Sequence, residues 1–522
     1  MELADLPVGA RVEDWTEISG CFSVCGFHIP SRSLVVVRDH FGKRPAFYAE
    51  ADGMIIVASE CKTLQALGVP LEVDPTVLRE AYLYRWVLGE WHLFEACRQV
   101  PLGTMVTWSP EASFQNHGFW TPRFEPEAEK PGFFDEYCER TDRALRHTIR
   151  AAGQSYGRVG LLLSGGVDSS LLAALAREEV DSLDAYVGRI PGCRNREDER
   201  ARKVADMLGI RLHVVDIDPS RFARDFPYMV RRIEELPRHT NNLVLCQLYE
   251  AAEGSVDVML EGDGTGTFWG HSNSKQTFQF AEKTRKVEVI PRSFRQAAAG
   301  LLERIPGDMA WRIARVLAWD PLLYARTREA VCYSRPILDS LGLSLLNEDA
   351  WKSGEWDETL PLDDEIQAFM VRNLLRGSNI RHDRLSQPHG IAALSPFLST
   401  DCWEVSRAMP REYRIMSGRT KPVLRSLLGR YLPMEVGQWK KMGFETPWPS
   451  WLRNELGPLR KEADSFLGAT PFLPEGFWGV ANRVGDPEAI WTALSLFALL
   501  REFGLLESCS RDSVCPPMAS IS

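Results

Sequence analysis

Short apolar runs separated by turn residues characterise the first part of the chain. Between residues 15 and 110 these runs lie at 22–27, 34–37, 46–48, 54–58 and 105–108, and residues 59–67 have the spacing of a short helix. Short apolar runs between glycine- and proline-containing turns predict antiparallel strands. Residues 121–132 are rich in proline and charge, which predicts a linker after this β-rich region.

A different pattern begins after the linker. Apolar residues at helical spacing (134–149) lead into an apolar strand at 158–163, and then come helix 169–179, strand 183–187, helix 197–208, strand 211–217 and strand 256–260. Strands that alternate with helices predict a parallel sheet with helices on both faces. The sequence therefore predicts an α/β protein with a β-rich region at 1–120, a linker at 121–132, an α/β domain at 133–510 and a tail at 511–522.

Composition narrows the class of protein. The 522-residue chain has 71 Asp and Glu against 61 Lys and Arg and a net charge of −10, which argues against generic nucleic-acid binding. It has no apolar run long enough to span a bilayer, and its first residues lack the basic and apolar regions of a signal peptide. Eleven cysteines are scattered without the spacing of a metal site. These features predict a cytoplasmic protein with buried free thiols.

The candidate chemistry lies in the loop between strand 158–163 and helix 169–179, where residues 164–169 are Ser-Gly-Gly-Val-Asp-Ser. Glycines let backbone amides approach a phosphate closely, and the start of a helix favours an anion. Asp168, at the helix entry, is placed to hold Mg²⁺ against phosphate oxygens. Val187 and Gly188 end the next strand, where a parallel sheet binds its ligands, so we expect backbone groups there to receive adenine.

The loop resembles the pyrophosphate loop of enzymes that adenylate a substrate and release pyrophosphate. Residues 37–48 (Val-Arg-Asp-His-Phe-Gly-Lys-Arg-Pro-Ala-Phe-Tyr), 58–64 and 93–103 resemble the later half of the glutaminase domain of glutamine-dependent asparagine synthetases. Residues 381–386, 395–398, 418–425 and 441–447 resemble motifs of the synthetase domain of that family. The resemblance covers most of 16–109 and 158–455. It implies a shortened, glutaminase-like β-rich domain followed by a PP-loop synthetase domain of the adenine nucleotide α-hydrolase-like kind, with helical additions.

The resemblance also implies ATP and Mg²⁺ as cofactors and assigns residues to them. Lys421 and Lys441 match positions that contact pyrophosphate and the acyl-adenylate in this family and in the related β-lactam synthetases. A lysine suits that task because it is a compact positive charge. Asp168 and Asp263 are the implied Mg²⁺ ligands. The expected nucleotide-binding residues are Leu162, Ser164, Gly165, Gly166, Asp168, Ser169, Val187, Gly188, Gly262 and Asp263.

Three departures from the family pattern bear on function. Gly266 stands where the family has an aspartate that holds a second Mg²⁺, and Thr267 replaces the glutamate that follows. Glu2 stands where the mature chains of the family begin with a nucleophilic cysteine, which predicts a domain without glutaminase activity. Residues 392–394 (Ala-Ala-Leu) replace Glu-Val-Arg, which predicts a larger or less polar acyl substrate.

Together these observations predict an ATP-dependent amide ligase that adenylates a carboxylate, releases pyrophosphate and transfers the acyl group to an amine. The resembled family includes the lasso-peptide cyclases, which take the amine from the peptide itself. The preferred hypothesis is such macrolactam cyclisation of a peptide, because of the chain length, the apolar stretch 392–394 and the sixteen tryptophans. The alternatives are an ammonia-using asparagine synthetase and a non-catalytic nucleotide-binding scaffold, which Gly266 supports. The expected partners are a small-molecule or peptide carboxylate substrate and a leader-peptide-binding or peptidase protein, but no nucleic acid and no membrane.

Overall fold

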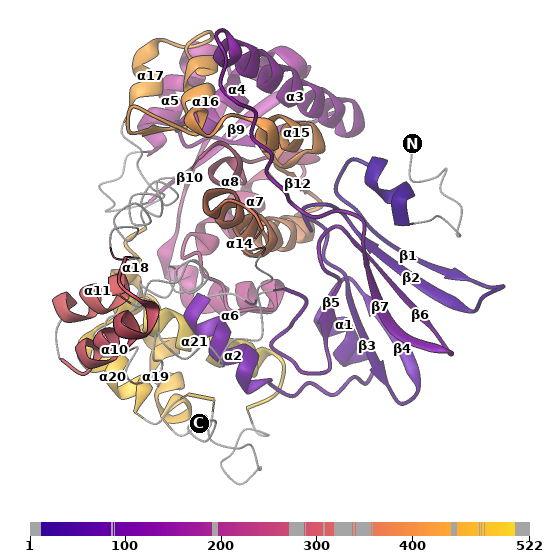
Figure 1. Ribbon diagram of the computed structural model, residues 1–522, viewed down its shortest axis with the longest axis vertical. Helices are drawn as coiled ribbons and strands as arrows, with labels where there is room; N and C mark the ends of the chain where they lie inside the picture. Colours follow the sequence, from indigo (N-terminus) through magenta and orange to yellow (C-terminus); the bar gives the residue numbers. More distant parts are fainter. Residues whose placement is uncertain are drawn as a thin grey trace.

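A β-rich N-terminal unit and a larger α/β unit make up the computed structural model (Figure 1). The structure describes residues 12–84, 87, 89–190, 197–270, 287, 289–305, 308–317, 337, 340, 357, 359–439, 446–468, 470, 472–473 and 476–506. Within these ranges no helix is long and apolar enough to cross a membrane.

The N-terminal unit consists of two antiparallel sheets. The first has the order β1 (Ser23–His28), β2 (Ser33–Arg38), β6 (Thr104–Ser109) and β7 (Ala112–Gly118), and the second has β4 (Met54–Ala58), β3 (Phe47–Ala51) and β5 (Arg98–Gln99). Helix α1 (Cys61–Ala66) packs against β3 and β4, and α2 (Pro75–Tyr84) lies on the side of the sheets that faces the larger unit (Figure 1). The predicted strands of this region and its first helix are confirmed, whereas α2, β5 and β7 were not predicted.

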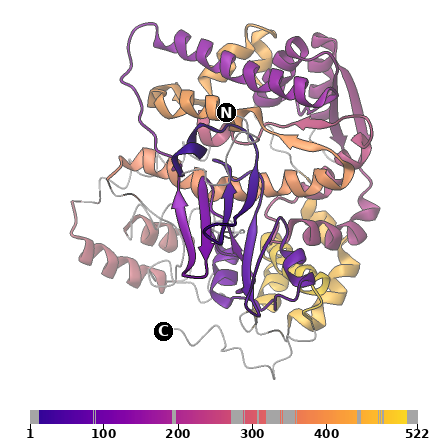
Figure 2. The ribbon, with the colours of Figure 1, turned by 90° about the vertical axis from the view of Figure 1, so that its right-hand side faces the viewer.

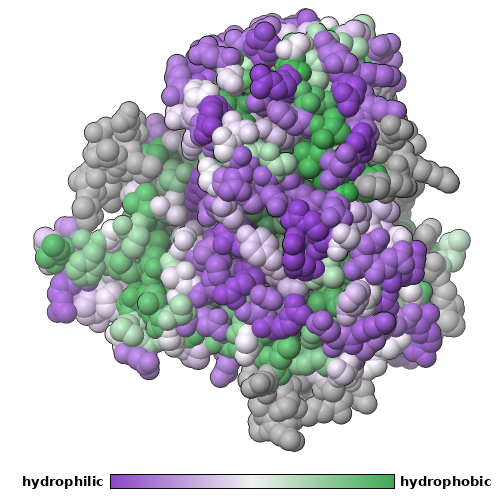
Figure 3. All heavy atoms as spheres, turned by 180° about the vertical axis from the view of Figure 1, so that it is seen from behind, coloured by the Kyte–Doolittle hydropathy of each residue, from purple (hydrophilic) through white to green (hydrophobic). Residues whose placement is uncertain are grey.

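The surface of this unit carries an apolar band at its free end. Phe27, at the end of β1, and Ile29, in the turn to β2, are 52% and 77% exposed. In the view from behind, green apolar spheres gather over this tip (Figure 3). Single exposed apolar residues are normal on soluble proteins, so this band by itself indicates no partner.

The larger unit is built on a five-stranded sheet in which every pair of neighbouring strands is parallel. The order is β10 (Arg211–Asp216), β9 (Leu183–Arg189), β8 (Val159–Leu162), β11 (Val258–Leu260) and β12 (Ala392–Leu394). In chain order, β9 and β10 are thus added on one side of β8, and β11 and β12 are then added on its other side. This switch point is where open α/β sheets bind ligands, at the carboxyl ends of the strands. The four predicted strands of this sheet are confirmed, and β12 is an addition.

Helices cover both faces of this sheet. Val159 and Leu161 of β8 pack into a core with α3 (Phe133–Tyr156), α4 (Val167–Glu179), α5 (Glu197–Leu208) and α16 (Pro422–Leu428). Met259 of β11 and Tyr186 of β9 face the other core, with α6 (Phe222–Ile233), α7 (Asn242–Ala252) and α21 (Pro487–Glu502). The remaining described helices are α8 (Thr265–Trp269), α10 (Arg292–Glu303), α11 (Asp308–Leu317), α14 (Leu362–Ser386), α15 (Thr400–Ala408), α17 (Met434–Gln438), α18 (Trp448–Arg453), α19 (Gly457–Leu467) and α20 (Phe477–Val484).

Helix α14 joins the two units. It runs across the molecule behind the N-terminal sheets (Figure 2). Asn379 donates to the Phe41 carbonyl at 2.9 Å, Arg384 pairs with Glu60 at 3.0 Å, and Asp383 pairs with Arg44. Because each bond crosses from α14 to the N-terminal unit, the helix fixes how the two units sit against each other.

The predicted linker carries neither helix nor strand up to Lys130, and yet its first half is packed. Phe124 is buried, and the amides of Glu125 and Glu127 donate to the carbonyls of Arg407 and Ala408 at 2.9 and 2.8 Å. Residues 127–132 are exposed. The linker therefore runs along the end of α15 before α3 begins.

Candidate active site

The loop after β8 is folded on itself by its two serines. Ser169 Oγ accepts from the Ser164 amide at 3.2 Å and lies 3.1 Å from Ser164 Oγ. Gly165 has φ +72°, and a Cβ atom there would lie 2.6 Å from the Arg200 Cβ. Such backbone favours glycine, and the contact leaves no room for a side chain. The sequence thus places a compact loop of backbone amides at the start of α4, the geometry that binds phosphate groups.

Lys421 and Asp168 meet beside this loop although 253 residues separate them in the chain. Lys421 Nζ lies 2.6 Å from Asp168 Oδ2 and 3.0 Å from Thr265 Oγ1. The side chain of Lys421 is 8% exposed, and its left-handed backbone (φ +60°) at the start of α16 directs it inward. Asp168 Oδ1 is buried and has no hydrogen-bond partner among the described residues. The pair therefore leaves one carboxylate oxygen for a further ligand.

The end of β11 approaches the same point from the neighbouring strand. A Cβ atom at Gly262 would lie 3.4 Å from the Asp168 Cβ, so Gly262 and Asp168 are adjacent. Asp263 follows directly and is bonded to Arg381 at 2.9 Å. The Ser395 hydroxyl, just beyond β12, donates to the Asp263 carbonyl at 2.6 Å. Three neighbouring strands thus contribute to one site at the switch point.

Charges around Asp263 form a buried group. Burial alone raises the pKa of a carboxyl, but Arg381 and His382 outweigh it and hold the pKa of Asp263 well below its ordinary value. Burial and the charge of Asp263 raise the pKa of Glu261. Ligand atoms of Glu261, Asp263 and His382 lie within 4.8 Å of one another, a spacing that suits a cation. Tyr249 fixes the His382 ring through a 2.7 Å bond between its hydroxyl and Nδ1.

The two residues expected to receive adenine, Val187 and Gly188, point their main-chain groups in opposite directions. On the side of β9 that faces β8, the Tyr186 carbonyl accepts a hydrogen bond from the Leu163 amide. On the side that faces β10, the Arg189 carbonyl accepts one from the Ile217 amide. Main-chain groups in a strand alternate between its two neighbours. Gly188 therefore turns its amide and carbonyl toward the loop, beyond the end of β8, whereas Val187 turns them toward β10. Only Gly188 presents main-chain groups to the site.

The remaining expected residues fall at different places. Leu162 is the last residue of β8, directly before the loop. Gly266 and Thr267 lie in α8, and the adjacent Thr265 contacts Lys421. Lys441 lies outside the described residues. Arg381 and His382 lie in a motif that resembles the family, but no role was assigned to them or to Thr265, because their contacts with Asp263 and Lys421 depend on how α8 and α14 pack.

A separate cavity of about 550 Å³ lies between the N-terminal unit and α14. Its lining includes Phe41, Trp91, Trp120 and three arginines. The arginines already have acceptors: Arg38 donates to Val100 O at 2.8 Å, Arg376 to Gly89 O at 2.8 Å, and Arg372 pairs with Glu365. The cavity therefore combines aromatic walls with arginines that already donate hydrogen bonds to the protein. It was not predicted from the sequence.

Comparison with known proteins places this architecture in a class. The family description "Asparagine synthase" matches residues 140–472, and "Glutamine amidotransferase domain" matches residues 9–120. The parallel sheet with its Ser-Gly-Gly-Val-Asp-Ser loop is that of an ATP-dependent carbon–nitrogen ligase. The chain belongs to the asparagine synthase family.

Relatives in this family are distant. Asparagine synthetase [glutamine-hydrolyzing] 1 of Bacillus subtilis (strain 168) is 22% identical over 93% of this chain and 78% of its own length. Amidase chry2 of Gibberella zeae is 21% identical over 84% of this chain and 70% of its own length. Among solved structures, glutamine-dependent NAD⁺ synthetase from Acinetobacter baumannii in complex with ADP has a TM-score of 0.21 and 15% identity, covering 48% of this chain and 61% of its own. A TM-score of 0.21 is too low to indicate a shared overall fold.

Proposed function

We propose that the protein adenylates a peptide carboxylate with ATP and Mg²⁺ and transfers the acyl group to an amine of the same peptide, closing a macrolactam. The observation that supports the adenylation step best is the meeting of Lys421 with Asp168 beside the loop 164–169. A buried lysine and a ring of backbone amides suit the charge that develops on a departing pyrophosphate.

In the first step, a carboxylate oxygen attacks the α-phosphorus of ATP, and the bond from that phosphorus to the bridging oxygen of pyrophosphate breaks. The amides of Gly165 and Gly166 and the Lys421 ammonium would hold the pyrophosphate, while the Ser164 amide donates to Ser169 Oγ within the loop. The free Oδ1 of Asp168 fits a divalent cation, because a buried carboxylate oxygen without a partner is costly. Asp263 fits it less well, since Arg381 and His382 both contact its carboxylate, whereas Asp168 has Lys421 alone. Mg²⁺ held there would neutralise phosphate charge.

In the second step, the amine attacks the acyl carbon, the bond from that carbon to the AMP oxygen breaks, and the amine gives up a proton. The proposal places the adenine of the nucleotide against the main-chain groups of Gly188, past the end of β8. Lys441 is proposed to lie near the acyl-adenylate on the strength of the resemblance of residues 441–447 alone.

The peptide substrate is inferred from the acyl side of the site. Ala392, Ala393 and Leu394 form β12 next to β11, and each is half-buried. Leu394 O accepts from the Glu261 amide at 3.0 Å, so this apolar strand ends beside Asp263. A site whose family counterpart is charged but which is apolar here favours a less polar acyl group. A leader-peptide-binding or peptidase partner and a cytoplasmic setting are part of the same proposal.

Two other functions compete with this one. Ammonia-dependent asparagine synthesis is favoured by the relatives named asparagine synthetase, which extend over most of the chain. A nucleotide-binding scaffold without turnover is favoured by Gly266, which offers no carboxylate for a second metal ion. Each of the three functions predicts a different dependence of pyrophosphate release on substrate.

The deciding experiment measures pyrophosphate release by the full chain with ATP and Mg²⁺. The reactions contain no substrate, aspartate with ammonia, or a linear precursor peptide encoded near this protein. Asp168→Ala removes the carboxylate beside the loop, and Asp181→Ala, an exposed position after α4, is the matched control.

The macrolactam proposal expects release only with the peptide, a product lighter by one water, and loss of both in Asp168→Ala but not in Asp181→Ala. Release with aspartate and ammonia would replace it by asparagine synthesis. ATP binding without release, in the presence of the peptide and candidate partner proteins, would replace it by the scaffold.

A further inference from the structure

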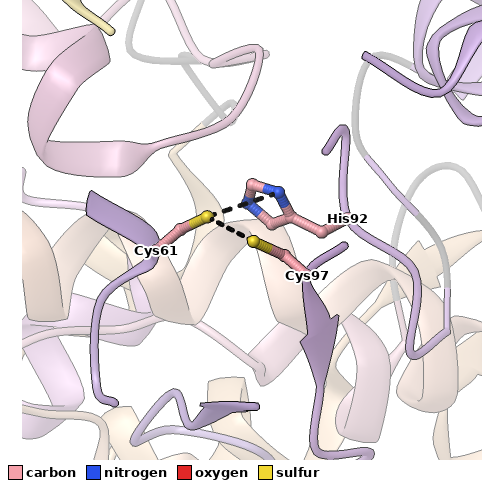
Figure 4. A group of neighbouring side chains, drawn as sticks. All are labelled: Cys61, His92 and Cys97. Atoms are coloured by element: carbon pink, nitrogen blue, oxygen red, sulfur yellow. Dashed lines mark hydrogen bonds between the residues drawn. The ribbon is translucent and has the colours of Figure 1, made fainter. Parts of the chain in front are cut away.

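Three side chains that bind soft metal ions meet inside the N-terminal unit (Figure 4). Cys61 begins α1, His92 lies in the loop before Phe94, and Cys97 precedes β5. The two Sγ atoms lie 2.9 Å apart, and Cys61 Sγ lies 3.9 Å from His92 Nδ1. All three side chains are 0% exposed. The chain separates these residues by 31 and 5 positions, which is why no metal-site spacing showed in the sequence.

The imidazole is prepared to act as a ligand. Burial, and next the charge of Arg376, lowers the pKa of His92 to about 3, so the ring is neutral at physiological pH. The Phe94 amide donates to the lone pair of Nδ1 at 3.2 Å, which leaves the proton on Nε2; Nδ1 is also the nitrogen that faces Cys61. The ring is buried beside the backbone of Glu234, which favours the protonated form but is outweighed by burial. A neutral, fixed imidazole is the form in which histidine binds metal ions.

We propose that Cys61, Cys97 and His92 Nδ1 bind a thiophilic divalent cation of the Zn²⁺ class. Thiolates with an imidazole are ligands that zinc prefers, and they suit hard cations such as Mg²⁺ poorly. Two S–H bonds break, two Zn–S bonds form and two protons leave to solvent. Two thiolates and one Zn²⁺ then sum to zero charge, which a buried site requires.

The cluster needs only a small rearrangement to accept the ion. Zn–S bonds of about 2.3 Å in a tetrahedral site hold two sulfurs roughly 3.8 Å apart. The sulfurs would therefore separate by about 1 Å from their present contact. Nδ1 would exchange its 3.2 Å hydrogen bond from the Phe94 amide for the bond to the ion. Three protein ligands leave the fourth position to a water molecule.

The ion would bind where the two units meet. The Cys61 amide donates to Glu234 Oε2, in the α/β unit, at 2.9 Å. Arg376 of α14 donates to the carbonyl of Trp91, next to His92, at 3.0 Å. Metal binding would thus tie α1, the loop before Phe94 and the start of β5 together and hold them against Glu234 and α14. This role is structural and independent of the proposed ligase activity.

The test uses the full chain, expressed with zinc, purified under reducing conditions and dialysed, and measures metal content by mass spectrometry. Cys61→Ser and Cys97→Ser remove ligands, and Cys402→Ser removes an equally buried thiol outside the cluster. We expect about one zinc per chain in the wild type and in Cys402→Ser and roughly a tenth of that or less in the cluster variants. Adding Zn²⁺ to the chelator-stripped chain should raise its melting temperature, but not that of Cys61→Ser.

If the cluster variants do not fold, the wild-type chain alone decides. In mild denaturant, Zn²⁺ should slow alkylation of Cys61 and Cys97 and leave alkylation of the exposed Cys25 unchanged. The proposal is overturned if the wild type carries no zinc, if Cys402→Ser loses as much zinc as the cluster variants, or if Zn²⁺ protects neither thiol. A peptide that joins Cys61 to Cys97 in an unreduced digest, together with an absence of zinc, would make the pair a disulfide instead.

Discussion

At the scale of single residues, the position of Lys421 depends on an uncommon backbone. Its φ of +60° is a conformation that non-glycine residues seldom adopt. Such strain of about 1 kcal/mol or more persists when surrounding contacts enforce it, and it clusters at functional sites. Here Asp168 and Thr265 bind the ammonium at 2.6 and 3.0 Å. The backbone of α16 and the charge of Asp168 therefore act together to keep a buried cation beside the loop.

Removing this cation tests its role. Lys421→Ala should lower pyrophosphate release by about 100-fold or more, which corresponds to roughly 3 kcal/mol of transition-state stabilisation. Lys421→Arg keeps the positive charge but not the compact shape of the ammonium. Its rate of pyrophosphate release should lie between those of the wild type and Lys421→Ala. Steady-state kinetics with the accepted substrate measure both. Wild-type kcat in Lys421→Ala, with the protein folded, would remove Lys421 from the chemistry.

The loop glycines allow a second test, of stability. Gly165→Ala should destabilise the protein by about 1–3 kcal/mol, because the alanine needs an unfavourable φ and its Cβ collides with Arg200. Gly166 has φ −77°, and a Cβ there would meet only Ser164 Oγ at 3.4 Å. Gly166→Ala should therefore change the urea midpoint little. Equal midpoints for the two variants would contradict the tight packing described for Gly165.

At the scale of elements, α14 carries a buried arginine whose acidic partners come from both units of the molecule. Arg384 is 1% exposed and lies 3.0 Å from Glu60 and 3.6 Å from Glu234, which is itself 1% exposed. Removing one partner of a buried ion pair leaves an uncompensated charge, which costs more than the pair contributes. The helix therefore depends on its partners in the N-terminal unit.

Substitution of this arginine has a predictable cost. Arg384→Ala should reduce the free energy of unfolding by about 3 kcal/mol, the lower end for a broken buried pair, because Glu234 stays buried but keeps Lys62 at 3.3 Å. Arg430→Ala breaks a pair with Glu139 in which both side chains are more than a third exposed, and should cost less than about 1 kcal/mol. Urea denaturation followed by circular dichroism compares the two. Similar losses would mean that water reaches the pair at Arg384.

The elements also show what a sequence can and cannot predict. Strands β8 and β11 were predictable because a buried parallel strand is a continuous apolar run bounded by loops. The half-exposed edge strand β10 was predictable from the alternation of strands with helices. Strand β7 was not, since its side chains at the sheet edge are mostly polar and exposed. Strand β12 has three residues and begins at Ala392, far along the chain from its partner β11, which ends at Leu260. Nothing in such a short run indicates that it completes a sheet.

The same reasoning applies to the site. Residues within one βα turn, such as Ser164, Gly165 and Asp168, were predictable because local sequence determines a local turn. Lys421 was found through the resemblance of its motif, and the structure brings it to Asp168. Arg381 and His382 were missed because their contact with Asp263 depends on the packing of α14. The cluster of Cys61, His92 and Cys97 was missed because these residues are far apart in the sequence and meet only when α1 packs beside the segment before β5.

At the scale of the whole molecule, the boundary predicted at residue 120 does not divide the hydrophobic core. One cluster of buried side chains contains Phe47, Leu64 and Phe94 from the N-terminal unit and Phe226 and Trp491 from the α/β unit. The rings of Phe94 and Phe503 lie 5.1 Å apart across the boundary. Burial of apolar surface is the main favourable contribution to folding. A core shared in this way should make the two units fold as one.

This shared core leads to a test on the covalent connection. A protease site inserted between Ala128 and Lys130, in the exposed part of the linker, allows the folded chain to be cut. The two pieces should remain together in gel filtration and unfold in a single thermal transition, because the core and the buried pairs of α14 hold them. Residues 133–510 expressed alone should be insoluble or aggregate, since Phe226 and Trp491 would lose their apolar partners. Separation of the cut pieces in native buffer, each with its own transition, would show two independent domains and would limit the proposed zinc site to a role within the N-terminal unit.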